Sequence, residues 1–251
     1  MRIIDVPAGW PADEKAARAV QDALRTRVVL DEPGPPPGAG PVTGVDVAYD
    51  DARDLVAAAA VVLDPETLAV MERSTAVGRV AFPYVPGLLA FRELPAVLAA
   101  LESLSSDPGL IVCDGYGRAH PRRFGLASHL GVLTGLPAVG VAKNPFVFTH
   151  GPLGPDRGDA AALLPGEGDI GEGEEREDEV GRALRTQRGV KPVYVSVGHR
   201  VTLDNACAHT LRLTPRYRLP ETTRLADRLC RQALADAAGR VPPYSSTHPG
   251  S

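Results

Sequence analysis

The chain has 251 residues, 44% of them hydrophobic and 23% charged, so it is long enough to bury a core without disulfide or metal support. It contains no run of roughly 18 apolar residues and does not begin with an apolar stretch, so we expect neither a membrane span nor a secretory signal. The three cysteines are odd in number and far apart, which is typical of reduced thiols in the cytoplasm.

The net charge of −4 is distributed unevenly along the chain. Residues 167–179 hold eight acidic residues and one arginine, a net charge of −7, so the rest of the chain carries +3. A slightly basic body is compatible with a nucleic-acid partner, because local charge steers a polyanion. We interpret the acidic segment as a solvated tether, with a DNA mimic or a repulsive segment as the alternatives.

The first half of the chain predicts one helix followed by three strands. Residues 12–30 space their apolar side chains as an amphipathic helix does, and the proline-rich connector at 31–41 follows. Runs typical of strands occupy 43–50, 55–64 and 68–80. Because these runs are consecutive and joined by short turns, we expect an antiparallel meander.

The second half alternates between strands and helices. Short strands are predicted at 109–115 and 137–143 on either side of a helix at 124–135, a pattern typical of a parallel sheet with right-handed crossovers. The other predicted elements are a helical stretch that ends near residue 104, a strand at 191–203 and helices near 204–213 and 220–237.

This order of elements predicts an α/β fold in which a ribonuclease H-like mixed sheet is flanked by helices. We assign residues 1–240 to a single domain. A Gly-, Pro- and Glu-rich stretch at about 150–189 is predicted to be a flexible acidic insertion, and residues 241–251 are predicted to be a disordered tail.

Two aspartates occupy positions from which a sheet can present them to a ligand. Asp46 lies within a predicted strand, and its neighbours on the same face, Gly44 and Ala48, are small. A buried carboxylate at this position needs a partner. The alternative is an acid at a sheet edge that faces water. Asp114 ends an apolar strand, and ligands gather outside the carboxyl ends of parallel strands. Its alternative role is to cap the following helix.

The residues after Asp114 are suited to an anionic polymer. Gly115 and Gly117 lack side chains, so a phosphate or a base can approach the backbone closely. The same stretch supplies a cluster of donors, namely Arg118, His120, Arg122 and Arg123.

Glu93 and Lys143 are further candidates. Glu93 lies in a helical stretch in which we expect Pro95 to end one turn and start another, and its apolar surroundings require a cation or donor. The alternative is a surface pair with Arg92. Lys143 ends a predicted strand next to Asp114, where it could hold an attacking water or neutralise a phosphate. A surface lysine is the alternative.

Taken together, these acids favour a hard cation with oxygen ligands. No Cys and His residues have the spacing of a zinc site. Mg²⁺ takes few carboxylates and keeps waters and substrate phosphates as its other ligands, and it activates water for attack on phosphate. The sequence therefore predicts a Mg²⁺ cofactor, with Mn²⁺ as an alternative.

Residues 82–87, with the sequence FPYVPG, form a stiff turn. Pro83 and Pro86 hold Tyr84 and Val85 in an extended conformation. A rigid exposed tip of this kind could enter a stack of bases, and enzymes that recognise a damaged base commonly rotate it into a pocket. The alternative is a rigid loop whose tyrosine packs on the core.

Five stretches of the chain resemble the endonuclease V family. They are TGVDVAY, FPYVPGLLAFRELPAVLAAL, IVCDGYGRAHPRRFGLASHLGVLTGLPAVGVAKN, VSVGHRVTLDNA and YRLPETTRLAD. These stretches cover nearly the whole chain apart from the N-terminal helix, the connector at 31–41, the loop at 148–190 and the tail. The resemblance is specific, because the run DGxGxxHPRRxGxASHxG is long and particular to the family.

The resemblance implies that residues 1–240 form an endonuclease V-like catalytic domain with a ribonuclease H-like fold. It implies Mg²⁺-dependent hydrolysis of DNA at the second phosphodiester bond 3′ to deoxyinosine, the product of adenine deamination. The expected products carry a 5′-phosphate and a 3′-hydroxyl, and the expected role is DNA repair by a monomer. The alternatives are an inosine-specific endoribonuclease and a non-catalytic nucleic-acid binder with the same fold.

The resemblance also implies roles for particular residues. The catalytic residues by this match are Asp46, Glu93, Asp114 and Lys143, and the metal ligands are Asp46, Asp114 and Glu93. Asp227 is expected either to hold a second metal ion or to support a ligand. The wedge that meets the DNA is Pro83, Tyr84, Val85 and Pro86. The residues near the flipped base are Gly115, Gly117 and His120.

The chain departs from the family's pattern in three places. The loop after Lys143 (NPFVFTHGPLGPDRGD) and the acidic segment are longer than the pattern implies, which puts the contacts just after the lysine in doubt. Tyr116 fills a variable position, where its ring would change the contacts available to a base.

Overall fold

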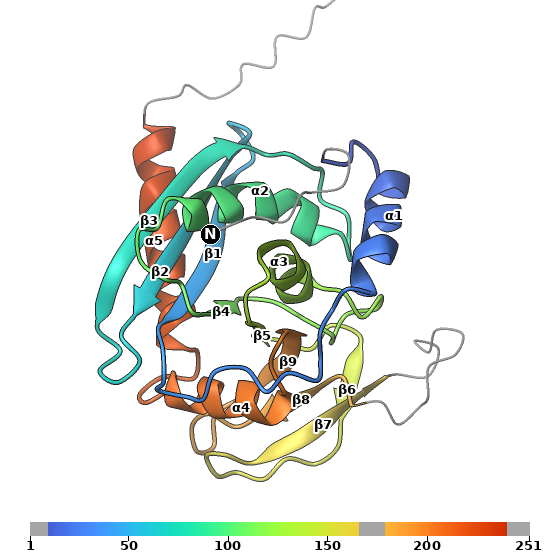
Figure 1. Ribbon diagram of the computed structural model, residues 1–251, viewed down its shortest axis with the longest axis vertical. Helices are drawn as coiled ribbons and strands as arrows, with labels where there is room; N and C mark the ends of the chain where they lie inside the picture. The colour runs from blue at the N-terminus through green and yellow to red at the C-terminus, as the bar shows by residue number, and fades with distance from the viewer. Residues whose placement is uncertain (1–9, 166–178, 240–251) are drawn as a thin grey trace, which may run out of the picture.

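The computed structural model describes residues 10–165 and 179–239. Within these residues, nine strands form one mixed sheet in the order β3-β2-β1-β4-β5-β9-β8-β7-β6 (Figure 1). The strands are β1 (Val42–Asp50), β2 (Leu55–Leu63), β3 (Val70–Arg79), β4 (Leu110–Cys113), β5 (Ala138–Ala142), β6 (Phe148–His150), β7 (Ala160–Pro165), β8 (Gly181–Leu184) and β9 (Val193–His199). The helices are α1 (Glu14–Arg25), α2 (Leu89–Glu102), α3 (Leu126–Thr134), α4 (Leu203–Arg212) and α5 (Glu221–Ala238). The predicted α/β fold, a mixed sheet flanked by helices, is confirmed.

Strands β1, β2 and β3 form the predicted antiparallel meander. Every residue of β2, with the sequence LVAAAAVVL, is buried, because helices cover both faces of this strand. Strand β4 then pairs in parallel with β1, and β5 pairs in parallel with β4. The carboxyl ends of β4 and β5 therefore lie at the same edge of the sheet.

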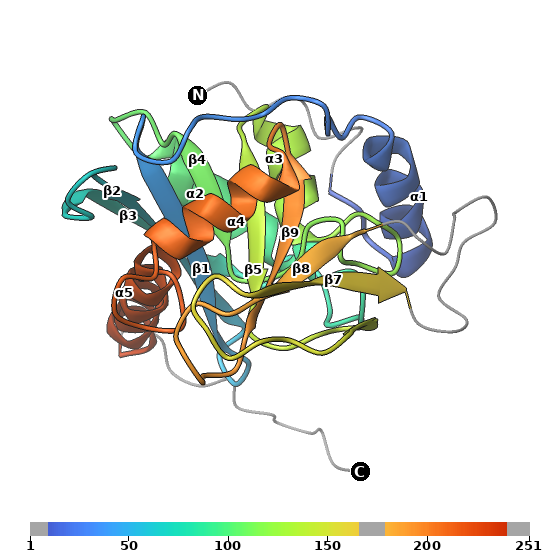
Figure 2. The ribbon, with the colours of Figure 1, turned by 90° about the horizontal axis from the view of Figure 1, so that it is seen from below.

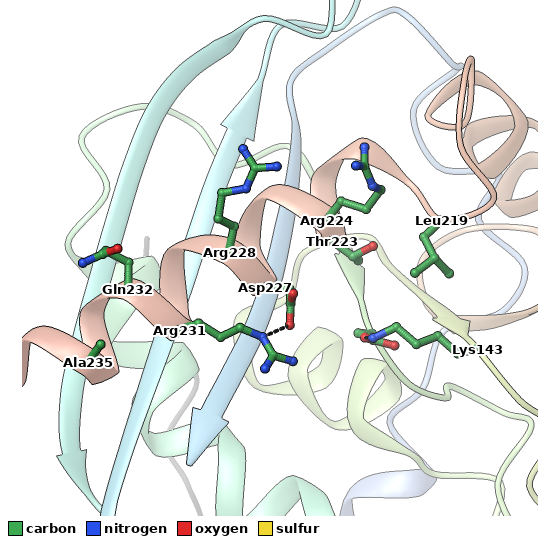
Figure 3. A pocket seen from close by; sticks show the side chains of 10 residues that line it. Lys143, Leu219, Thr223, Arg224, Asp227, Arg228, Arg231, Gln232 and Ala235 are labelled. Atoms are coloured by element: carbon green, nitrogen blue, oxygen red, sulfur yellow. Dashed lines mark hydrogen bonds and ion pairs between the residues drawn. The ribbon is translucent and has the colours of Figure 1, made fainter. Parts of the chain in front are cut away.

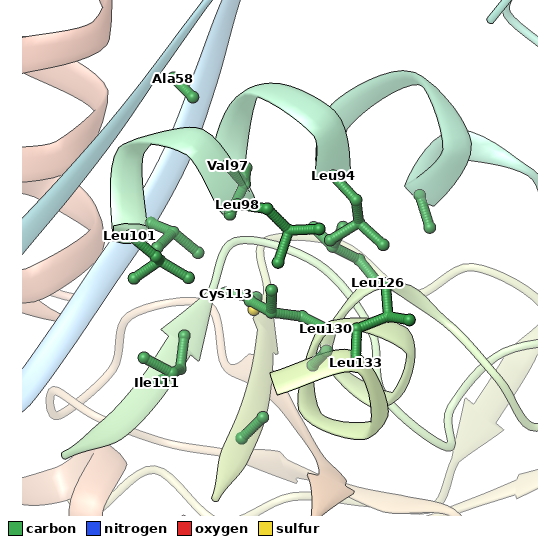
Figure 4. Packing of buried hydrophobic residues seen from close by; sticks show 14 of the residues in the cluster. Ala58, Leu94, Val97, Leu98, Leu101, Ile111, Cys113, Leu126, Leu130 and Leu133 are labelled. Carbon is green, nitrogen blue, oxygen red and sulfur yellow. The ribbon is translucent and has the colours of Figure 1, made fainter. Parts of the chain in front are cut away.

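The two faces of the sheet carry different helices (Figure 2). Side chains along a strand alternate between faces, so Ile111 and Cys113 of β4 pack with α2 and α3, whereas Leu110 and Val112 pack in the cluster that includes α4. Figure 4 shows the first of these clusters, in which leucines of α2 and α3 meet over β4. Helix α5 covers the face of β1 and β2 that α2 does not.

Gly44 allows α5 to pass close to β1. A Cβ atom at this position would lie 2.3 Å from the backbone carbonyl carbon of Thr222, which is far closer than real contacts allow. The missing side chain brings α5 against the strand that carries Asp46, and this contact positions the candidate site.

Helix α2 runs through Pro95 without a break, so the prediction that Pro95 ends one turn and starts another is wrong. Proline has no N–H, so the carbonyl of Phe91 four residues earlier loses its partner within the helix. The indole Nε1 of Trp10 donates a 2.7 Å hydrogen bond to this carbonyl. A side chain distant in sequence therefore satisfies the group that Pro95 leaves free.

The prediction of a flexible insertion at about 150–189 is wrong for part of this range. Strands β7 and β8 lie within this range and, together with β6, extend the sheet beyond β9. Their short apolar runs are flanked by Gly, Pro and Glu, and this composition concealed the strands. Of the acidic segment 167–179, all but residue 179 lies outside the described residues, as does the predicted tail at 241–251.

No helix in the two described ranges has both the length and the apolar character needed to cross a bilayer.

Candidate active site at the carboxyl ends of β4 and β5

The sheet places Asp46, Asp114 and Lys143 on one face. The register aligns Val45 with Cys113 on adjacent parallel strands, so the two aspartates follow at neighbouring positions. Lys143 follows directly after β5, the next strand in the sheet. Because β1 lies between β2 and β4, Asp46 is not an acid at a sheet edge.

Lys143 forms an ion pair with Asp114. Burial alone would lower the pKa of the Lys143 ammonium, but the hydrogen bond and the charge of Asp114 outweigh it and raise that pKa. Asp114 caps no helix, since α3 begins only at Leu126 and its N-cap is Gly125. The structure thus places Lys143 beside Asp114, where the sequence predicted it, and Lys143 is not an isolated surface lysine.

Asp46 is half-buried between the sheet and α5. Burial, together with the negative charges of Asp114 and Asp227, raises the pKa of its carboxyl to about 7, despite a 2.8 Å hydrogen bond from the Val47 backbone N–H. Several carboxylates thus lie close enough to disfavour one another's charge, which is an arrangement that a bound cation would stabilise.

Glu93 is only 8% exposed. The hydroxyl of Tyr49 donates a 3.2 Å hydrogen bond to its carboxylate, whereas Arg92 pairs with Asp51 at 2.5 Å. The alternative of a surface pair between Glu93 and Arg92 is therefore wrong. Burial, with a further contribution from the charge of Asp46, raises the pKa of Glu93 to about 8.

Asp227 lies on α5 and accepts a 2.8 Å hydrogen bond from Nε of Arg231 one turn later. Together with Asp114 and Lys143 it lines an open groove of about 560 Å³, which we call the α5 groove (Figure 3). The other residues of the α5 groove are Leu219, Thr223, Arg224, Arg228, Arg231, Gln232 and Ala235. The structure therefore brings Asp227 to the same side of the sheet as Asp46 and Asp114.

The donor set suits a hard cation. Among the described residues, no three His, Cys, Asp or Glu side chains are drawn together tightly enough to form a ready-made ligand cluster. Mg²⁺ needs only one or two carboxylates in addition to water and substrate phosphates. The adjacent carboxylates of Asp46 and Asp114 meet that requirement, and the mutual repulsion that raises the pKa of Asp46 is what a divalent cation would relieve.

A second concavity, of about 330 Å³, lies on the other side of Asp114 and Lys143. We call it the Tyr84 pocket. Its lining includes Tyr84, Val85 and Pro86 of the predicted wedge, and Gly115 and His120 of the predicted base site. The structure therefore brings together two groups of residues that the sequence suggested separately.

Tyr84 is exposed to solvent, whereas Gly117 is packed against a strand. Tyr84 is 67% exposed, so the alternative in which its ring packs on the core is wrong. Gly117 packs against β9 rather than lining the pocket, and a Cβ atom there would lie 2.0 Å from the carbonyl oxygen of Val197. Its missing side chain thus serves the contact between the loop and β9.

His120 is buried and neutral. Its Nδ1 accepts a 3.2 Å hydrogen bond from the Arg122 backbone N–H, so Nε2 carries the proton and donates to the carbonyl oxygen of Gly87 at 3.1 Å. Burial lowers the pKa of this imidazole to about 4. His120 therefore fixes the backbone at Gly87, directly after the predicted wedge, without carrying charge.

Sequence reasoning missed Gln21 and Phe146, which also line the Tyr84 pocket. Gln21 interrupts the apolar stripe of α1 between Ala17 and Leu24, and a buried amide in such a stripe signals a specific partner. Phe146 stacks on the ring of Tyr116 with centroids 5.6 Å apart, so the loop after Lys143 supplies an aromatic wall.

Comparison with known proteins agrees with this geometry. The model of the endonuclease V family matches residues 22–228. Endonuclease V of Streptomyces coelicolor is 72% identical over 238 residues, which cover 95% of this chain and 98% of that protein. The crystal structure of endonuclease V from Streptomyces avermitilis has 72% identity and a TM-score of 0.86, covering 92% of this chain and 97% of that one.

A more distant relative was crystallised with nucleic acid. Endonuclease V of Ciona intestinalis, in complex with a 24mer DNA containing an inosine followed by a ribo-adenosine, has 26% identity and a TM-score of 0.73. The match covers 90% of this chain and 100% of that one. With its family match, its close relatives and its fold, the chain belongs to the endonuclease V family.

Proposed function

We propose that the protein is a metal-dependent endonuclease that recognises deoxyinosine in DNA. It hydrolyses the second phosphodiester bond 3′ to the lesion and leaves a 5′-phosphate and a 3′-hydroxyl, as a step in the repair of deaminated adenine. The Ciona relative, which was crystallised with inosine-containing DNA, supports this class of substrate. The acids and the lysine predicted for catalysis are present, which disfavours a non-catalytic binder.

One observation carries the proposal: Asp114 and Lys143 line both the Tyr84 pocket and the α5 groove. A base held in the pocket lies next to the carboxylates, so a nearby phosphate of the same strand can reach them. Recognition and hydrolysis then take place at adjoining sites.

The exposed ring of Tyr84 is suited to occupy the space that a rotated base leaves in the duplex. Beneath it, His120 and Gln21 hold the carbonyl of Gly87 and keep the mouth of the pocket in shape. Most of the other residues that line the Tyr84 pocket are apolar or present their backbone. Such a lining suits a planar, uncharged base.

Hydrolysis is assigned to the residues between the two concavities. Asp46 and Asp114 would hold Mg²⁺ or Mn²⁺, which when bound lowers the pKa of water and stabilises charge on the phosphate. The Lys143 ammonium, held by Asp114, can neutralise charge that develops on the phosphate oxygens. Glu93, held by the hydroxyl of Tyr49, lies near enough to Asp46 and Asp114 to sense their charges, and would supply a third carboxyl.

Inosine-containing RNA is the second candidate substrate, because the DNA bound by the Ciona relative carries a ribo-adenosine after the inosine. Parallel cleavage assays on matched DNA and RNA oligonucleotides distinguish the two. We expect faster cleavage of DNA with deoxyinosine. Cleavage confined to RNA would transfer the proposal to the second candidate, and release of free hypoxanthine from intact strands would indicate a glycosylase and contradict both.

We further infer that the protein works in the cytoplasm as a monomer. Its three cysteines are buried and unbonded, as expected in a reducing compartment. One chain supplies the wedge, the pocket and the carboxylates, so the proposed site needs no residue from a second copy.

A further inference from the structure

We propose that α5 binds the phosphodiester backbone of the substrate strand on the 3′ side of the cut, with Arg228 as its principal contact. This inference rests on the proposed function and extends it to a part of the substrate that lies beyond the reacting bond. The ligand class is a single-stranded or unwound nucleic-acid backbone, recognised by charge rather than by base.

The basic residues of α5 form a stripe beside the active site. Arg224, Arg228 and Arg231 are three or four positions apart, so they lie on neighbouring parts of the helix surface. Figure 3 shows them extending from successive turns of α5. The lining from Thr223 to Ala235 spans about 18 Å at the rise of an α-helix, which is long enough for more than one phosphate.

Most cations of the α5 groove are already paired. Lys143 binds Asp114, and Arg231 binds Asp227. Arg224 binds Glu221 at 2.9 Å and lies 3.6 Å from the ring centroid of Tyr217.

Arg228 differs from these residues. It is exposed and makes neither a hydrogen bond nor an ion pair with any residue in the described part of the chain. A phosphate can therefore bind Arg228 without displacing a partner, and the exposed guanidinium loses little hydration on binding. Guanidinium groups suit phosphate because their parallel N–H donors match its oxygens.

The α5 groove adjoins another concavity at each of its two ends. A further groove, lined by residues 47–51 and the last turns of α5, shares Arg231 and Ala235 with it. At its other end the α5 groove shares Asp114 and Lys143 with the Tyr84 pocket.

The three concavities therefore form a continuous series. A strand whose lesion occupies the Tyr84 pocket, and whose scissile phosphate lies at Asp114, leaves along α5. Since the proposed cut is 3′ to the lesion, the segment over Arg228 is the 3′ arm.

The test measures binding of deoxyinosine oligonucleotides with a fixed 5′ arm and a 3′ arm of increasing length, in EDTA, by fluorescence anisotropy. We expect the affinity of the unaltered protein to rise as the 3′ arm passes the scissile bond. Arg228→Ala should remove much of this gain, roughly fivefold for an exposed charge contact. It should also reduce the slope of log K against log salt by about 0.7 to 0.9, the value for one phosphate.

Two further variants sharpen the result. Arg228→Lys keeps the charge and should retain the salt slope. Arg188→Ala removes an arginine whose side chain is 81% exposed and which pairs with Asp156 outside these grooves, so it should change nothing.

The inference would be overturned, while the proposed function stands, if Arg228→Ala lost the same affinity for oligonucleotides with short and with long 3′ arms. A loss of affinity that depended on the length of the 5′ arm would overturn it too. An unaltered protein that binds none of these oligonucleotides in EDTA and cuts none of them in Mg²⁺ would overturn both.

Discussion

The side-chain amide of Gln21 donates a 2.9 Å hydrogen bond to the backbone carbonyl of Gly87, 66 residues later in the chain. A second hydrogen bond of 3.4 Å joins the same nitrogen to the carbonyl of Phe124. Gly87 has a φ of +80°, a conformation that favours glycine, and it ends the turn that carries Tyr84. Helix α1 therefore supports the turn that carries the proposed wedge, although the stretches that resemble the family begin only after this helix.

Replacing Gln21 by Leu should weaken the site more than the fold. The substitution removes one of the two donors to Gly87, so we expect a loss of about 1 to 2 kcal/mol in the free energy of unfolding. Cleavage of inosine DNA should fall further, by roughly tenfold, because a small displacement of positioning residues has large effects on rate. Chemical denaturation and single-turnover kinetics measure the two effects. The control is Arg18→Ala, which breaks an exposed ion pair with Glu14 on the same helix and should leave both unchanged. Unaltered cleavage in Gln21→Leu would refute this supporting role.

Replacing Tyr84 by Ala should selectively reduce recognition of the lesion. The ring is largely exposed, so its removal should leave the melting temperature within a degree or two, roughly the effect of a surface substitution. Affinity for an inosine duplex should fall by roughly tenfold, the cost of losing one aromatic stack, while affinity for an undamaged duplex changes little. Tyr84→Phe keeps the ring and should keep the selectivity. Equal losses on both duplexes would contradict a wedge role.

Replacing Asp114 by Ala should separate binding from chemistry. The change removes one of the two proposed metal-holding carboxylates and the partner of Lys143, so cleavage should fall by roughly a thousandfold or more. Binding to inosine DNA should persist, because the Tyr84 pocket keeps its other walls. Asp46→Ala should behave in the same way. Asp204→Ala, an exposed acid that pairs with Arg182, is the control. A fully active Asp114 variant would remove this residue from the reaction.

Lowering the pH should reduce the free energy of unfolding through protonation of His129. This imidazole lies against Phe91, Phe124 and Trp10, and its ring nitrogens have no hydrogen-bond partner among the described residues. Burial lowers its pKa from 6.5 to about 3. The unfolded chain therefore binds a proton that the folded chain does not, and stability falls as the pH drops below 6.5, by up to about 1.4 kcal/mol per pH unit.

His129→Leu removes this titration. Its free energy of unfolding should fall less steeply than that of the unaltered protein between pH 6.5 and 4. Because other groups titrate in the same range, the quantity to compare is the difference between the two curves. Parallel curves would show that His129 does not contribute.

Much of the fold follows from patterns within short segments. The meander strands predicted at 43–50 and 55–64 are observed at Val42–Asp50 and Leu55–Leu63, because alternation and continuous apolar runs determine strands locally. The same holds for the position of Asp114, since a carboxylate after an apolar strand belongs at the carboxyl end of the sheet.

The sequence-based predictions that were wrong depend on contacts between segments that are distant in the chain. Pro95 remains inside α2 because Trp10 satisfies the freed carbonyl, and no local pattern reveals that partner. Gly117 packs against β9, so its role depends on a strand that comes about 80 residues later. A sequence pattern shows which glycines a loop contains, but the tertiary fold decides which of them faces the pocket.

The most direct test of the central claim is cleavage of a labelled duplex with one deoxyinosine, in Mg²⁺ and in EDTA, with the product mapped at nucleotide resolution. The account predicts a Mg²⁺-dependent nick at the second phosphodiester bond 3′ to the lesion, with a 5′-phosphate and no cut in the undamaged duplex. A folded protein that binds this duplex but leaves it intact in Mg²⁺ and in Mn²⁺ would contradict the account.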